Sequence, residues 1–120
     1  MFYFFKNQNE RRESGGSAFI EIQYCKLKRE TDLNKIKDFH SVQNWQDDSL
    51  YVHAEDIDDF FLEYGDIFQG VDCYGINYFP PAQLKEIIAK TEIRKPSDYA
   101  ALLKWLKRAS DFNGVYILGI

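Results

Sequence analysis

The feature that most constrains this chain is an amphipathic segment, residues 54–64, inside a region without lysine or arginine. No lysine or arginine occurs between Lys37 and Lys85, whereas ten aspartates and glutamates do. On a helix of 3.6 residues per turn, one face of the segment is apolar and contains Ile57, Phe60, Phe61 and Tyr64. The opposite face contains Glu55, Asp59, Glu63 and Asp66, flanked by Asp56 and Asp58. Burial of the apolar face therefore predicts a helix whose carboxylates point outward.

The acidic face costs stability, because like charges three or four residues apart repel each other by about 0.2–0.5 kcal/mol per pair. Burial of each large side chain on the apolar face contributes about 1.5–3 kcal/mol, so the helix tolerates the repulsion. Leu62 projects at nearly the same angle as the carboxylates. This combination favours a surface that meets a basic partner, and a merely solvated acidic helix is the alternative interpretation.

Length and charge narrow the class of protein. A chain of 120 residues with 45% hydrophobic residues predicts one folded domain, residues 1–120, and excludes a disordered chain. The net charge is −4, and residues 39–84 carry nine acidic and no basic side chains. Such a surface repels phosphates, so no direct nucleic-acid partner is expected. No apolar run is long enough to predict a membrane span or a signal peptide, and we expect a cytoplasmic protein with Cys25 and Cys73 as reduced thiols.

The first half of the chain alternates strand and helix patterns. Residues 2–6 are apolar on both faces, which predicts an internal strand, and residues 7–17 form a polar loop. Residues 18–27 alternate, with Glu21 and Gln23 on the polar side, which predicts a half-buried strand paired with residues 2–6 in a hairpin. A helix capped by Thr31 extends to about residue 42, with His40 on its apolar side. A loop over residues 44–49 and a short strand over residues 50–53 precede the acidic helix. Gly65 is a candidate end for this helix, and continuation to Phe68 is an equal alternative.

The second half predicts two helices and a final strand. Residues 70–79 are aromatic and punctuated by glycine, a loop or an irregular strand. Pro80-Pro81 starts a helix, since proline suits the first helical position, and Lys95-Pro96 ends it. Ser97 is the expected cap of the next helix. Residues 115–120 are uniformly apolar, which predicts an internal strand. The predicted fold is α+β, a small and mainly antiparallel sheet with an N-terminal hairpin and a C-terminal strand, and about four helices packed on it.

Candidate catalytic and metal-binding groups are few. The two histidines, His40 and His53, are expected to be a core residue and a local charge partner, and no nucleophile-elbow motif is present. Asp56 and Asp58 point about 200° apart on a helix, so they cannot share one metal ion. We therefore expect neither catalytic residues nor a cofactor nor a metal site.

The stretches GVDCYGINYFPPAQLKEII, residues 70–88, and FNGVYILGI, residues 112–120, resemble small immunity proteins of bacterial toxin–immunity systems of the contact-dependent growth inhibition type. The resemblance covers about a quarter of the chain, and its motifs are not catalytic, so no site residue is transferred. It implies a cytoplasmic, non-catalytic inhibitor whose partner is a cognate protein toxin, often a nuclease.

Charge leads to the same expectation separately, because nuclease sites are basic and an acidic, aromatic surface can occupy them. The predicted partner-binding residues are acids and large side chains of the middle region: Asp47, Asp48, Asp56, Asp59, Leu62, Glu63, Asp66, Asp72, Tyr74 and Tyr78. Two alternatives stay open, a small enzyme that uses surface carboxylates and an adaptor subunit with a basic protein partner. The sequence does not predict the oligomeric state.

Overall fold

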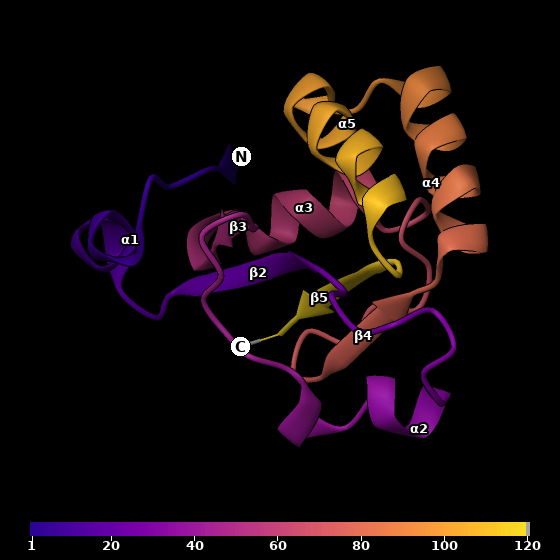
Figure 1. Cartoon of the computed structure of the whole chain (residues 1–120). Helices are drawn as coiled ribbons and strands as arrows, with labels where there is room; N and C mark the ends of the chain where they lie inside the picture. Colours follow the sequence, from indigo (N-terminus) through magenta and orange to yellow (C-terminus); the bar gives the residue numbers. More distant parts are fainter. Residues whose placement is uncertain (120) are drawn as a thin grey trace.

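The computed structural model describes residues 1–119 as an α+β fold around one five-stranded antiparallel sheet, in which the strand order is β1-β3-β2-β5-β4 (Figure 1). The strands are β1 (Phe2–Tyr3), β2 (Phe19–Tyr24), β3 (Leu50–His53), β4 (Ile76–Phe79) and β5 (Val115–Leu118). The α-helices are α1 (Gln8–Gly15), α2 (Leu33–Ile36), α3 (Ile57–Tyr64), α4 (Pro81–Arg94) and α5 (Tyr99–Lys107). Short 3₁₀ helices are η1 (Phe39–Ser41), η2 (Ala54–Asp56) and η3 (Arg108–Asp111).

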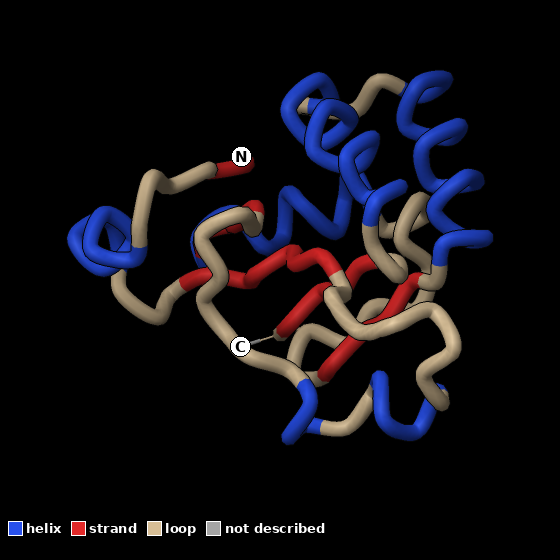
Figure 2. Tube along the Cα trace, in the orientation of Figure 1, coloured by secondary structure: helices blue, strands red, loops and turns tan. Residues whose placement is uncertain are grey.

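The main core lies between one face of the sheet and the helices α3, α4 and α5 (Figures 1 and 2). Alternate strand residues point to this face, among them Ile20, Ile22 and Tyr24 of β2 and Val115 and Ile117 of β5. The other face is covered by α1, the loop over residues 43–49 and the α2 region. Because both faces are covered, β2 and β5 are buried along their whole length.

The predicted N-terminal hairpin is wrong. Phe2 lies opposite Val52, so β1 pairs with β3 at the edge of the sheet, while β2 lies on the other side of β3. The predicted polar loop forms α1, because Asn7 caps this helix by accepting a hydrogen bond from the backbone N–H of Glu10. Because α1 lies between β1 and β2, no short turn joins these two strands as it would in a hairpin. β1 lies at the edge of the sheet, not inside it, and is two residues long.

Two predicted helix starts are also wrong. Asp32, not Thr31, caps α2, and Asp38 starts a separate 3₁₀ turn by accepting a hydrogen bond from the N–H of His40. The expected long helix is therefore cut short, and His40 is exposed rather than in the core. Asp98, in a left-handed conformation with φ of 58°, precedes α5 in the position expected for Ser97. α4 begins at Pro81, within the predicted start at Pro80-Pro81, and α3 ends at Tyr64, which favours Gly65 over Phe68 of the two predicted ends.

The final strand is central, as its uniformly apolar residues predicted. Strand β5 pairs with β2 on one side and β4 on the other, over Val115–Leu118. Ile120, the last residue of the predicted strand, lies outside the described residues.

We expect Tyr24→Phe to lower the free energy of unfolding by about 1–2 kcal/mol. The ring of Tyr24 stacks on Trp105 with 4.0 Å between ring centroids, and its hydroxyl donates to the Trp105 carbonyl at 2.7 Å. Burial raises the pKa of Tyr24, which keeps the hydroxyl a donor. Urea unfolding measures the change, and Tyr74→Phe is the control, since Tyr74 is 82% exposed. Equal midpoints for the two variants would contradict the hydrogen bond's contribution.

Candidate functional site

The acidic face of α3 is the candidate site, and the apolar face of the same helix holds it in place. Phe60 and Tyr64 are buried against the sheet-side core, as their helical spacing predicted. The Tyr64 hydroxyl donates to the carbonyl oxygen of Ser97 at 2.6 Å, which ties the end of α3 to the turn between α4 and α5. Phe2 of β1 packs edge-on against both aromatic rings. The helix is therefore anchored along its length.

The outer face of α3 exposes its carboxylates together with one large apolar side chain. Glu55, Asp58, Asp59, Glu63 and Asp66 are exposed, and Leu62 is 83% exposed among them. Asp66 forms an ion pair with Arg94 at 3.7 Å, and Glu63 accepts a hydrogen bond from Ser97 Oγ at 2.9 Å. Within residues 1–119, no other α3 or η2 carboxylate has a cationic partner within 4.0 Å. The negative charge of this face is thus largely uncompensated.

Asp56, another predicted site residue, borders this face rather than belonging to it. It is the residue before α3, it is half-buried, and its side chain makes no capping hydrogen bond. The capping group in this region is His53, whose Nδ1 accepts a hydrogen bond from the N–H of Glu55 at 3.1 Å. His53 thus acts on the backbone that leads into α3, and not on a charged side chain as expected.

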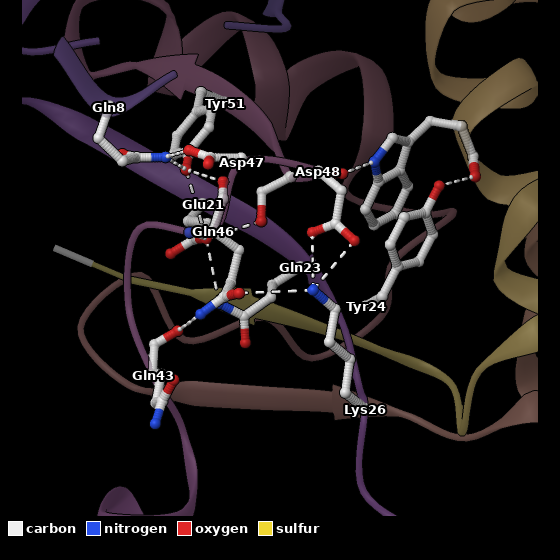
Figure 3. A network of polar contacts seen from close by, with 12 residues as sticks. Gln8, Glu21, Gln23, Tyr24, Lys26, Gln43, Gln46, Asp47, Asp48 and Tyr51 are labelled. Atoms are coloured by element: carbon white, nitrogen blue, oxygen red, sulfur yellow. Dashed lines mark hydrogen bonds and ion pairs between the residues drawn. The ribbon is translucent and has the colours of Figure 1, made fainter. Parts of the chain in front are cut away.

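A second group of polar side chains surrounds Glu21 on the other face of the sheet (Figure 3). The Glu21 carboxylate is buried and accepts hydrogen bonds from the N–H groups of Trp45 and Gln46, at 2.7 and 2.8 Å. It also accepts from Ser49 Oγ at 2.7 Å and Gln23 Nε2 at 3.0 Å. Glu21 was expected on a solvent-facing side of the strand. It is buried instead because the loop over residues 43–49 folds over it and supplies these donors.

Trp45 shows how firmly this loop is held. Its φ of 67° is uncommon for a bulky residue, and its N–H donates to Glu21. The guanidinium carbon of Arg11 lies 3.9 Å from the centroid of the Trp45 ring, a cation–π contact with α1. The Arg11 side chain is itself buried and bonds to Gln8 and to the carbonyl of Gly16. Contacts from β2 and α1 therefore stabilise this conformation of the loop.

The loop carries Asp47 and Asp48, which are engaged within the protein. Asp47 accepts a hydrogen bond from Gln8 Nε2 at 2.8 Å and remains exposed. Asp48 forms an ion pair with Lys26 at 3.0 Å, and its carbonyl oxygen accepts from Trp105 Nε1 at 2.7 Å. Asp48 thus links the loop to Lys26 and Trp105, whereas the Asp47 carboxylate is exposed to solvent.

Asp72 and Tyr74 lie in the turn before β4. The Asn77 side chain organises this turn: it accepts from the N–H of Asp72 at 2.7 Å and donates to the Asp72 carbonyl at 2.8 Å. The Asp72 carboxylate accepts from the N–H of Tyr74 at 2.9 Å, and the Tyr74 ring points outward. The turn therefore exposes the ring of Tyr74, while the Asp72 carboxylate accepts a hydrogen bond within the turn itself.

Tyr78 is the predicted site residue that the fold separates most clearly from α3. It packs with Tyr116 on the face of the sheet opposite the helices α3, α4 and α5. Its hydroxyl donates to the carbonyl of Asn113 at 2.6 Å, and burial, followed by the nearby Cys25, raises the pKa of Tyr78 to about 12. The ten predicted residues therefore do not form one surface. Asp59, Leu62 and Glu63 share the outer side of α3, Asp66 is exposed two residues past its end, and the remaining six lie around the helix or on other elements.

No group of three or more His, Cys, Asp and Glu side chains within residues 1–119 is placed to hold a metal ion. In the same part of the chain, no helix combines the length and apolarity that crossing a membrane requires.

Comparisons of the chain with protein-family models, with curated proteins and with solved structures found no match.

Proposed function

We propose that this protein is an immunity protein of the cytoplasm that binds and neutralises a cognate antibacterial toxin, with a basic nuclease domain as the target. The observation that carries the proposal is Leu62, which is 83% exposed among carboxylates that have few cationic partners within the protein. A solvated acidic helix has no need of a large apolar side chain at its centre. A protein-binding surface does, because an apolar anchor surrounded by charge combines burial with electrostatic selection of a partner.

Charge complementarity explains why a nuclease suits this surface. A nuclease holds phosphates and therefore presents lysines and arginines around its active site, which attract the α3 carboxylates. Complementary charge raises association rates to as much as about 10⁸–10⁹ M⁻¹s⁻¹ at low salt. An inhibitor that acts before its host's nucleic acid is cut benefits from such a rate.

The anchoring of α3 supports the same proposal. Buried Phe60 and Tyr64, the hydrogen bond from Tyr64 to Ser97 and the packing of Phe2 hold the helix before any partner arrives. A surface that is already ordered loses little conformational entropy on binding, so more of the contact energy appears as affinity.

Co-expression with the product of the adjacent gene tests the proposal. We expect a stable complex in which the partner's nuclease activity is lost, and survival of cells that produce both proteins. The matched control is the Asp59→Lys, Glu63→Lys variant, which should fold and fail to protect. If the partner has no toxic activity, or if the protein itself shows turnover that one carboxylate substitution abolishes, the enzyme or adaptor interpretation replaces this one.

Leu62→Ala should leave folding unchanged and increase the dissociation rate of the complex. The side chain contributes little to the core because it is exposed, whereas an apolar anchor at the centre of an interface contributes about 1–2 kcal/mol or more. The dissociation rate should therefore rise about tenfold, with little change in association rate. Surface plasmon resonance measures both rates, and Ile93→Ala is the control, since Ile93 is equally exposed on α4. Unchanged dissociation of the Leu62 variant would place the apolar contact elsewhere.

A further inference from the structure

A hollow of about 300 Å³ opens between the edge of the sheet and α5, away from the acidic face of α3. Its apolar wall consists of Phe2, Phe4, Leu50, Ala101 and Trp105. Two cations, Lys104 and Arg108, complete the lining, and both are exposed. The volume is at the lower end of the range of small-molecule sites.

The two cations are placed to act together. Lys104 and Arg108 are four residues apart on a continuous helical stretch, the end of α5 and the start of η3. Side chains at this spacing are neighbours, with about 5–6 Å between their Cβ atoms, so both can reach one anionic group. Neither has an acidic side chain within 4.0 Å in residues 1–119. A pair of uncompensated cations thus borders an apolar wall.

Two other hollows differ in this respect. One of about 300 Å³ between α4 and η3 is lined by Arg29, Lys85 and Lys107. There, Arg29 donates to the carbonyl oxygens of Ser110 and Phe112, and Lys107 forms an ion pair with Glu92 at 3.6 Å. In the third hollow, of about 250 Å³, Lys26 is paired with Asp48. In the second hollow Lys85 is likewise without an ion-pair partner in residues 1–119, but Arg29 and Lys107 are both engaged. Of these three hollows, the one beside α5 alone has an apolar wall and lining cations none of which forms an ion pair or a side-chain hydrogen bond within the described residues.

We propose that this hollow binds a small organic anion with an apolar body, of the class of medium-chain carboxylates. The apolar body would lie against Trp105, Leu50 and the phenylalanines, and the carboxylate would accept hydrogen bonds from Lys104 and Arg108. Hydrogen bonds to charged groups are the stronger class, and the guanidinium fork matches a carboxylate. Apolar burial contributes about 25 cal/mol for each Å² removed from water. The proposal is independent of toxin binding, because it uses no residue of α3.

Titration of the full chain with decanoate, below the concentration at which it forms micelles, tests the proposal. The probe signal is the indole N–H of Trp105 in ¹⁵N-labelled protein, assigned with Trp45→Phe, since the chain has two tryptophans. We expect a saturable one-site shift of the Trp105 signal. Decanol has the same apolar body without the charge, and its affinity should be lower than that of decanoate by at least about tenfold.

Paired charge removals locate the site. Lys104→Gln with Arg108→Gln should weaken decanoate binding by about tenfold to a hundredfold and leave decanol binding unchanged. Lys85→Gln with Lys107→Gln removes the same charge beside the other hollow and should change neither. The proposal is overturned if decanoate gives no saturable shift, if decanol binds equally well, or if the second pair of substitutions causes the loss. The comparison of decanoate with decanol uses the wild-type protein, so it tests the contribution of the ligand's charge even if a variant does not fold.

Discussion

Replacing Glu21 by leucine should lower the free energy of unfolding by about 3–5 kcal/mol, because a buried acceptor of several hydrogen bonds is lost. The N–H groups of Trp45 and Gln46, the hydroxyl of Ser49 and the amide of Gln23 all donate to this one carboxylate. A leucine side chain offers no acceptor, so the buried donors are left without partners. Since a domain of this kind is stable by only about 5–15 kcal/mol, the loss is a large fraction of the total.

Urea unfolding followed by tryptophan fluorescence measures the effect, since Trp45 is in the loop that Glu21 holds. Glu21→Gln keeps one acceptor oxygen and should cost less, about 1–2 kcal/mol. Glu13→Leu, an exposed substitution on α1, is the matched control for losing a carboxylate. A Glu21→Leu variant that unfolds at the wild-type midpoint would show that water satisfies the loop's donors, and that the loop does not depend on this residue.

Replacing Asp59 and Glu63 together by lysine should weaken binding of the partner by orders of magnitude while the fold stays intact. Removing one member of a desolvated charge pair costs about 2–5 kcal/mol or more, and a reversal adds repulsion. Both side chains are exposed, so the core is untouched. The substitutions remove repulsions between neighbouring carboxylates, and the lysine introduced at position 59 can pair with Glu55 one turn earlier. This gain offsets the lost hydrogen bond from Ser97 to Glu63.

Thermal melts and isothermal titration calorimetry, run on the same samples, separate the two effects. The melting temperature should hold or rise slightly, and the affinity should fall by about a hundredfold or more. Glu86→Lys with Asp111→Lys makes an identical change in net charge on other exposed elements and should bind nearly as the wild type does. Equal losses in both variants would mean that overall charge, and not the face of α3, governs binding.

Local sequence patterns predicted the buried side of α3, the start of α4 and the position of β5 well. The apolar spacing of Phe60 and Tyr64 predicted which side of α3 is buried, and Pro81 predicted where α4 begins. The uniformly apolar residues of β5 predicted a central strand, which pairs with β2 and β4. These features depend on neighbours in the chain and on burial, both of which the sequence contains.

Strand pairing and loop burial could not be predicted in the same way. β1 pairs with β3, and α1 forms between β1 and β2. The sequence of α1 is polar throughout, and its local helix signal is the cap residue Asn7. Glu21 follows the ordinary alternation of a strand with one solvated face. Only the distant loop around Trp45 buries it, and no local pattern reports such a contact.

The candidate site was predicted only in part for the same reason. Helical periodicity groups Asp59, Leu62, Glu63 and Asp66, and all four are exposed, the first three on α3 and Asp66 two residues past its end. Composition also grouped Asp48 and Tyr78 with them, because all lie in the acidic and aromatic middle of the chain. Asp48 is paired with Lys26, and Tyr78 packs on Tyr116 at the face of the sheet opposite α3. Residues that are close in sequence therefore do not form one surface with the α3 residues.

The central claim is that the outer face of α3 meets a basic partner, and the salt dependence of the association rate tests it most directly. Stopped-flow association of the toxin with wild-type protein should be fast at low salt and slow steeply as salt is added, since salt screens the attraction over about 10 Å at 0.1 M. The Asp59→Lys, Glu63→Lys variant should associate more slowly and lose most of that salt dependence, while the Glu86→Lys, Asp111→Lys variant keeps it. The same steep salt dependence in the wild type and the α3 variant would contradict the account.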